Sequence, residues 1–412
     1  AAGAGRWAAA AAAGPKPMDS QEALVSLLSR AGTVAGWLSP AVGSDLRLST
    51  NTTDTLRLMK RLGLRFAGRS VWVWGNEQLI PRMLPDVKKN AAAAHREMPD
   101  LVMEGCIFEI VTKKGVEALA IPKYVFEEFG LPVEARNFDY ERMLFPDGTF
   151  KDHWQPGSSV PDLTQLEARL WFFYVGTAWM LSGIEALHLG QIGLMSSRDA
   201  GMVWTHALLA RLRGFAARHA RRGFVLLNAH VYKDPFAHLN DTERLLWDFH
   251  CFPTRLQAEP SAPMNASLNP SFSDSIYGHS AGGLTVGGWT TKSLPYIVEL
   301  DNDDCTPHPG VQDPQDMHHP FGWDEISWFA HQRRAYRDWW LGYVVRWLAE
   351  HDPVGFLEMP LMKCLCDPMF PKLKRPPSTF YAASSALPPS HGGFGQEEAI
   401  AKLWAGPAAP AA

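Results

Sequence analysis

The stretch Gly183-Ile-Glu-Ala-Leu-His-Leu-Gly-Gln191 decides the fold prediction for this chain. It follows a long apolar helical pattern, Leu163 to Leu181, and ends in a glycine-bounded loop. A run this short and apolar is typical of a strand buried in a parallel sheet. Ionised groups are almost never fully buried without a partner, so Glu185 in such a strand requires either an ion pair or a chemical role.

Further short apolar runs alternate with helical patterns along the whole chain, which predicts a parallel α/β fold. No GxGxxG or P-loop motif opens any of the helices. Polar residues also gather at the carboxyl ends of nearly all the strands, where barrels build their sites. These features favour a (β/α)8 TIM barrel with long βα-loop insertions over an open sheet, in which only the strands beside the switch point carry such residues. The predicted strands are, in order, Gly32–Trp37, Ser70–Trp74, Ile107–Val111, the stretch around Glu185, Phe224–His230, Leu245–His250, Tyr296–Asp301 and Val354–Glu358.

The domain organisation follows from composition. Residues 1–17 are rich in Ala and Gly and are expected to form a disordered tail. Residues 18–366 are predicted to form the barrel, with insertions at 132–161 and 253–293. Insertions of this length in compact folds are usually functional or disordered. Residues 367–412 form a Pro-rich C-terminal extension with one short helix, expected near Gln396 to Trp404.

The bulk composition narrows the classes of partner. The 412 residues carry a formal net charge of -4 and no basic stripe, which argues against nucleic acid as the main partner. No run of 18 or more apolar residues occurs, so no membrane span is predicted. The five cysteines are an odd number without a CxxC spacing, and we expect free thiols in a reducing compartment. The expected free thiols and the lack of an apolar secretory segment together favour an intracellular location. Nothing in the sequence specifies the oligomeric state.

Carboxylates at strands four and seven of the predicted barrel point to glycoside hydrolysis, which requires one protonated and one ionised carboxyl group across the scissile bond. This arrangement, with Glu185 on strand four and Glu299 on strand seven, resembles the retaining (β/α)8 glycoside hydrolases. The resemblance covers residues 32–360. It implies that Glu185 is the general acid/base and Glu299 the nucleophile, with a carbohydrate substrate and no cofactor. In that group an Asn commonly precedes the strand-four glutamate, whereas Ile184 does so here.

Aromatic platforms and hydrogen-bonding side chains at strand ends are expected to bind the sugar. These candidate substrate-binding residues are Trp74, Glu109, Trp154, His188, Gln191, Asn228, His230, Asp248, His250, Asp301 and Trp323.

Two other functions use the same residues. The carboxylates and imidazoles of Glu185, His188, His230, Asp248, His250, Glu299 and Asp301 could hold a divalent metal such as Zn or Mn in a barrel isomerase or hydrolase. Alternatively, the barrel is inactive and serves in carbohydrate binding or as an assembly subunit. That third hypothesis predicts that Glu109, Glu185 or Glu299 is locked in an internal ion pair.

Overall fold

The computed structural model describes residues 16–39, 52–231, 235–240, 242–259, 261–262, 264–313, 315–316, 318–366, 380–388 and 391–405. The predicted N-terminal tail therefore lies almost entirely outside the described residues, as does most of the Pro-rich segment that follows Cys366.

Parallel strands form the centre of the molecule. Seven strands make one sheet in the order β16-β15-β1-β2-β3-β6-β7, and all neighbours are parallel except β15 and β16. A second parallel sheet has the order β14-β13-β8. The parallel α/β architecture predicted from the sequence is confirmed. The strands of the two sheets are β1 (Ala31–Val34), β2 (Phe66–Val71), β3 (Val102–Cys106), β6 (Ala186–His188), β7 (Leu226–Asn228), β8 (His250–Pro253), β13 (Tyr296–Glu299), β14 (Gly355–Leu357), β15 (Met359–Cys364) and β16 (Phe380–Ala382).

The two sheets adjoin in two places. On one side, a parallel bridge pairs His230, just past β7, with Cys251 of β8. On the other side, β14 and β15 follow each other in the chain with only Glu358 between them, and the backbone N–H of Glu358 donates to Val298 of β13.

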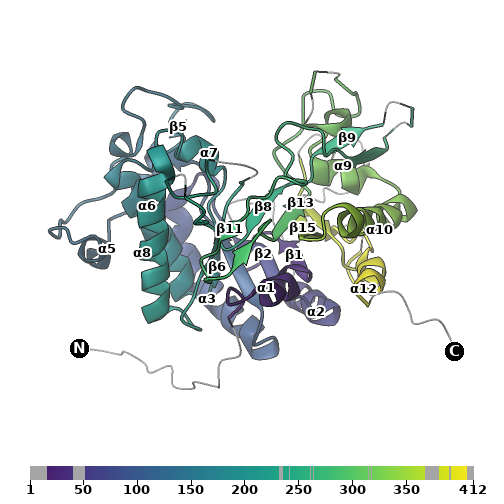
Figure 1. Cartoon of the computed structure of the whole chain (residues 1–412), viewed down its shortest axis with the longest axis horizontal. Coiled ribbons are helices and arrows are strands. Elements are labelled where there is room, and N and C mark those ends of the chain that lie inside the picture. The colour runs from purple at the N-terminus through teal and green to yellow at the C-terminus, as the bar shows by residue number, and fades with distance from the viewer. Residues whose placement is uncertain are drawn as a thin grey trace.

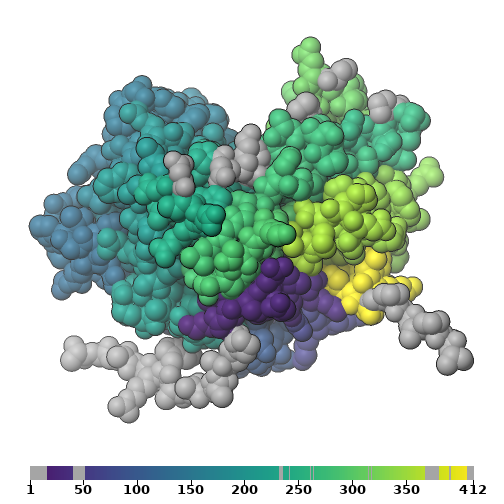
Figure 2. All heavy atoms as spheres, in the orientation of Figure 1, coloured from purple at the N-terminus to yellow at the C-terminus, as the bar shows by residue number. Residues whose placement is uncertain are grey.

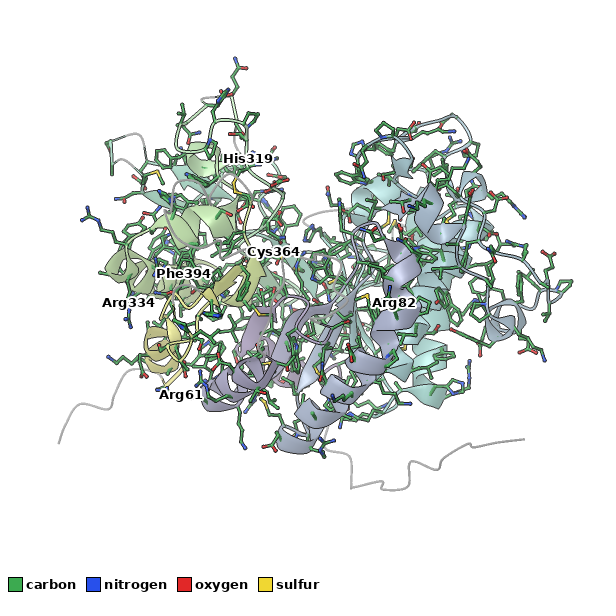
Figure 3. The ribbon with its side chains drawn as sticks, turned by 180° about the vertical axis from the view of Figure 1, so that it is seen from behind. Arg61, Arg82, His319, Arg334, Cys364 and Phe394 are labelled. Atoms are coloured by element: carbon green, nitrogen blue, oxygen red, sulfur yellow. A yellow bond between two sulfur atoms is a disulfide. The ribbon has the colours of Figure 1, made fainter. Side chains whose placement is uncertain are left out.

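Helices pack side by side around the outside of the strands. Contacts run from α8 to α6, α3, α2, α12 and α10 in that order. Arg57 and Arg61 of α2 both donate to the buried carboxylate of Glu397, which fixes α12 against α2; Figure 3 shows Arg61 beside that helix. The main helices are α1 (Gln21–Leu28), α2 (Thr52–Leu62), α3 (Ile80–Glu97), α6 (Leu166–Leu181), α8 (Val203–His219), α10 (Arg334–His351) and α12 (Glu397–Ala405).

Helix α1 covers the amino-terminal ends of the strands. Its buried leucines share a separate apolar cluster with residues at the beginnings of several strands, among them Phe66, Val102, Ala186 and Leu226. Figure 1 shows α1 lying across this end. Because the strands of the two sheets other than β16 are parallel, their carboxyl ends lie on the opposite side of the molecule.

Two lobes rise at the carboxyl ends of the strands. One contains the segments after β3 and β6, and the other contains the segments after β8 and β13 (Figure 1). Figure 2 shows the surface hollowed into a notch between these lobes. The short elements of the lobes and connections are η1 (Glu77–Leu79), β4 (Val111–Thr112), α4 (Lys113–Val116), α5 (Lys123–Glu128), η2 (Glu141–Met143), β5 (Ser158–Ser159), α7 (Ile192–Met195), η3 (Ala200–Met202), β9 (Leu256–Ala258), β10 (Ala266–Leu268), β11 (Gly283–Leu284), β12 (Thr290–Thr291), η4 (Pro320–Gly322) and α9 (Glu325–His331).

Several strands begin or end elsewhere than predicted. Strands β2 and β3 end before the apolar residues Trp72 and Ile107, which were expected to lie in strands. These residues are buried all the same, because the lobe at the strand ends covers them. Strand β8 begins at His250, where the sixth strand was predicted to end, and Glu185 precedes β6 instead of lying in it. The apolar runs therefore predicted which residues are buried but did not predict where the strands begin and end.

The cysteines differ from prediction in one respect. Cys305, in the loop after β13, forms a disulfide with Cys366 just past β15, so the expectation that all five thiols are free is wrong. Sequence spacing could not reveal this pair because 61 positions separate the two residues. Cys106, Cys251 and Cys364 are buried and are not part of a disulfide; Figure 3 labels Cys364.

Removal of the disulfide should lower stability. The bond closes a long chain loop, so the double variant Cys305→Ser/Cys366→Ser should lose about 2–4 kcal/mol of the free energy of unfolding. Urea denaturation with and without a reducing agent measures this loss. Reduction should destabilise the native protein by a similar amount and leave the double variant unchanged; equal sensitivity of the two would contradict the disulfide.

Candidate functional site

A group of buried charges occupies the space among the central strands. We call Arg69 (β2), Glu104 (β3), Glu299 (β13), Glu358 and Lys363 (β15) the central ion cluster. All five side chains are buried. Buried ions are stable only when they are paired or change their protonation state, so the contacts inside the cluster determine its chemistry.

An irregularity in β2 places the first of these charges. The β2–β3 register shifts between Ala67 and Val71, and Arg69 between them has a left-handed φ of 53°. Such bulges re-aim a side chain toward a site. The Arg69 guanidinium forms an ion pair with Glu299, and its backbone N–H donates to Glu104 Oε2 at 3.0 Å. One residue thus connects two carboxyl groups on different strands.

Glu299 is held by two cations. Lys363 Nζ lies 2.7 Å from Glu299 Oε2, and Arg69 binds Oε1. Both Glu299 and Lys363 have 0% side-chain exposure. Charge-assisted hydrogen bonds of this kind favour the ionised carboxylate. Burial lowers the pKa of Lys363 to about 8, and the neighbouring charge of Arg69 contributes to this shift.

The environment of Glu104, in contrast to that of Glu299, favours the neutral carboxyl group. Burial and the nearby carboxyl group of Glu358 raise the pKa of Glu104 to about 7, although the hydrogen bond from Asn228 acts to lower it. Burial also raises the pKa of Glu358. Two interacting carboxyl groups titrate as a pair, so the rise in pKa belongs to Glu104 and Glu358 together. Gly68 is necessary for this arrangement, because a Cβ at that position would overlap the Glu358 carboxylate.

Two histidines adjoin the cluster. Asn228 Nδ2 donates to Glu104 at 2.7 Å, so Asn228 Oδ1 accepts from His188 Nδ1–H at 2.7 Å. This leaves His188 Nε2 as an acceptor, buried and without a protein hydrogen bond. The His230 ring lies 4.8 Å from the His188 ring, and His230 Nε2 is 3.6 Å from Glu299 Oε1. Burial lowers the pKa of both imidazoles well below its usual range, so both are neutral.

The structure does not bring Glu185 and Glu299 together. Glu185 lies before β6, at the amino-terminal side, where Arg222 Nη2 donates to it at 2.7 Å and Arg221 Nη2 at 3.0 Å. Its side chain is fully buried. The residue that the sequence marked as acid/base is therefore part of a structural ion pair on the side opposite the strand exits.

Two more predicted residues are also structural. Asp248 accepts from Arg213 at 2.9 Å and from the backbone N–H of Leu227 at 2.8 Å, which ties α8 to β7. His250 Nδ1 is 3.0 Å from the Ser280 hydroxyl. Burial, with a smaller contribution from His238, lowers the pKa of His250 to about 3.

Other predicted residues shape the loops at the strand ends. Glu109 accepts from the backbone and side-chain amides of Gln191, both at 2.9 Å. Trp154 donates to the Glu109 carbonyl and packs edge-on against Trp74, which is 38% exposed.

The last two predicted residues lie near the exit of β13. Asp301 is half-buried, and its backbone N–H donates to Glu325. Trp323 is buried and stacked on His331. Of the predicted residues, the structure therefore gathers His188, Asn228, His230 and Glu299 around one cluster.

Sequence reasoning missed Arg69, Glu104 and Lys363. Each is a single charge inside an apolar strand, the same signal that drew attention to Glu185. A search of every strand for a single charged residue would have found these three residues. It could not have shown which of the charged residues contact one another.

The predicted metal set is split by the fold. His230, Cys251 and Glu299 do present ligand atoms within 4.8 Å of one another. However, Arg69 and Lys363 already bind both Glu299 oxygens, and two adjacent cations repel a divalent metal. A second set comprises Cys305, Asp324 and Cys366, but its two sulfurs are bonded to each other. We therefore assign no metal to either set.

Comparisons with known proteins add little. No protein-family model matches the chain, and no curated protein sequence is similar to it. Among solved structures, an α-galactosidase from Thermus thermophilus is 15% identical over 51% of this chain and 41% of its own, with a TM-score of 0.27. A γ-CGTase from alkalophilic Bacillus clarkii is 10% identical over 92% of this chain and 56% of its own, with a TM-score of 0.40. The chain spans about half the length of these structures, and likeness at this level establishes neither activity nor substrate. No helix among the described residues is long and apolar enough to cross a membrane.

The position of Glu185 yields a prediction about stability. Glu185→Gln removes the charge that pairs with Arg221 and Arg222, so it should lower the free energy of unfolding by about 1–3 kcal/mol. Glu398→Gln, at a largely exposed pair with Arg61, is the control and should change it by less than ~0.5 kcal/mol. Denaturant titration compares the two. Equal midpoints would argue against a structural role for Glu185.

Proposed function

We propose that the chain is a (β/α)8-barrel enzyme that cleaves a glycosidic bond, with Glu299 as the ionised carboxylate and the Glu104–Glu358 pair as the proton donor. The observation that supports it most is that Arg69 contacts two buried carboxyl groups in different electrostatic environments. It ion-pairs with Glu299, while its backbone holds Glu104, whose pKa is raised to about 7. Titratable pairs whose pKa values are driven apart are the usual sign of an acid and its partner.

The barrel part of the proposal rests on the strand pairings. The order β1, β2, β3, β6, β7 continues through the His230–Cys251 bridge to β8, β13 and β14. Since β14 leads directly into β15, which pairs with β1, these contacts are those expected of eight parallel strands in a ring. The ring of helices outside and α1 across the amino-terminal end also suit a barrel.

The proposed chemistry follows from the charges. Glu299 supplies a carboxylate at a strand exit, held in place by Arg69 and Lys363, to stabilise or attack the sugar carbon. The Glu104–Glu358 pair supplies the proton that the leaving oxygen requires. His188 Nε2 can accept a hydrogen bond from a sugar hydroxyl, and the neutral His230 ring can accept or donate one beside Glu299. Glu185 has no part in this scheme, because its Arg partners hold it at the opposite side.

A second function, carbohydrate binding without turnover, is favoured by one observation. Both oxygens of Glu299 are engaged by cations, and the ion pair with Lys363 is fully buried. Such a pair also suits a purely structural role. The two functions differ in what Glu299 does for turnover, and mutagenesis separates them.

Glu299→Gln and Glu104→Gln should each reduce turnover of a chromogenic glycoside by roughly 10²–10⁴-fold, because each removes a group that acts on the reacting bond. Glu185→Gln is the matched control and should keep turnover at a temperature where it is folded. Circular dichroism checks the fold of all three. Unchanged turnover in Glu299→Gln would refute the enzymatic role, and sugar binding without any turnover by the native protein would favour the second function.

Turnover should also depend on pH. The donor must be protonated, so with a pKa of about 7 its active form is present below neutral pH and is lost as pH rises through that value. Glu358→Gln removes the neighbouring charge that raises this pKa, so the fall in kcat should move to lower pH. A kcat–pH profile measures both effects. A fall that stays at the same pH in Glu358→Gln would contradict the coupled pair.

A further inference from the structure

A pocket separate from the central ion cluster opens among the segments that follow β2 and β3. Its volume is about 470 Å³, within the range of about 300–1,000 Å³ typical of small-molecule sites. Segments from three parts of the chain line it: the exit of β2, the β4–α4 turn and the turn before β5.

The floor of the pocket is rigid. The buried Glu77 carboxylate accepts from the backbone N–H of Thr112 at 2.8 Å and also from its hydroxyl. A Cβ at Gly115 would overlap Glu77, so glycine allows this close approach. The third segment is fixed by Lys113 N–H, which donates to the Gly157 carbonyl at 2.9 Å. The pocket is therefore preformed, which lowers the entropic cost of binding.

The lining chemistry suits a sugar. Trp74 offers a partly exposed indole beside amide side chains of Asn76, Gln78 and Gln155. An aromatic face stacks on the apolar face of a sugar ring, and amides bond its hydroxyls. Trp74 is supported by edge-on contacts to Phe108 and Trp154.

The charges of the lining are of one sign. Lys113 and Lys114 are the charged residues among those that line the described pocket, with no carboxylate among them. Lys113 Nζ lies 3.6 Å from Glu141, which also binds Lys151, so Lys113 is partly neutralised from outside the pocket. Glu77 lies below the floor with both oxygens used by Thr112. A ligand in this pocket therefore meets a net positive wall that favours an anion.

We propose that this pocket binds an anionic sugar, a pyranose ring that carries a carboxylate or a phosphate, with the ring on Trp74 and the anion toward Lys114. A chain of side-chain contacts connects the pocket to the central ion cluster. Trp74 packs on Phe108, the centre of whose ring lies 5.4 Å from the Arg69 guanidinium carbon, and Arg69 binds Glu299. A role as a subsite of catalysis rests on the proposed function, whereas binding itself does not.

Isothermal titration calorimetry of the full chain with glucuronate, glucose 6-phosphate and glucose tests the proposal. At least one charged sugar should bind about tenfold more tightly than glucose, and added salt should weaken that preference. Preference for glucuronate or for glucose 6-phosphate identifies the anion as carboxylate or phosphate. Equal affinity for glucose, or no binding of either charged sugar, would overturn the proposal.

Variants locate the site. Lys114→Gln should weaken binding of the charged sugar about tenfold and leave glucose unaffected, and Trp74→Ala should weaken both. The matched controls are Lys123→Gln, an exposed lysine of α5 paired with Glu127, and Trp339→Ala, a tryptophan 54% exposed on α10. If Trp74→Ala does not fold, the affinity of Lys114→Gln for the charged sugar tests the proposal by itself. Unchanged binding of the charged sugar by Lys114→Gln would overturn the proposal. If Glu299→Gln binds the charged sugar but has no turnover, binding at this pocket does not depend on catalysis.

Discussion

The ion pair between Arg69 and Glu299 is the interaction on which the centre of the molecule depends. It joins β2 to β13, which belong to different sheets, and it requires the irregular backbone of β2. A lone charge in this space would be strongly destabilising, so Arg69, Lys363 and Glu299 exist there only as a set. Burial raises the pKa values of the excess carboxyl groups, Glu104 and Glu358, which favours their neutral forms.

The sequence predicts the general fold because burial leaves a pattern in it. Parallel strands covered on both sides are continuous apolar runs, and these are recognisable wherever they occur. Their ends are harder to predict, since residues such as Trp72 and Ile107 are equally buried once a lobe covers them. The Cys305–Cys366 bond could not be foreseen because loop geometry, which no local pattern encodes, brings the two residues together.

Part of the candidate site was also predictable, because parallel strands place their carboxyl ends on the same side. His188, Asn228, His230 and Glu299 lie at strand ends and do converge, as alignment in a parallel sheet requires. Glu185 was misleading because a buried charge signals that a partner exists without revealing which partner it is. Its partners, Arg221 and Arg222, lie in a loop on the amino-terminal side. Glu185 precedes the first residue of β6 and so lies at the amino-terminal end of the strand, whereas His188 is the last residue of β6 and lies beside the cluster.

The central claim is that one carboxyl group beside an ionised Glu299 keeps its proton near neutral pH. Isotope-edited infrared spectroscopy with labelled glutamate measures this directly, because protonated and ionised carboxyl groups absorb at different frequencies. The account predicts a protonated-carboxyl band just below pH 7 that disappears as the pH rises and is lost or altered in Glu104→Gln, but persists in Glu185→Gln. Fully ionised glutamates in the native protein from mildly acidic to neutral pH would contradict it.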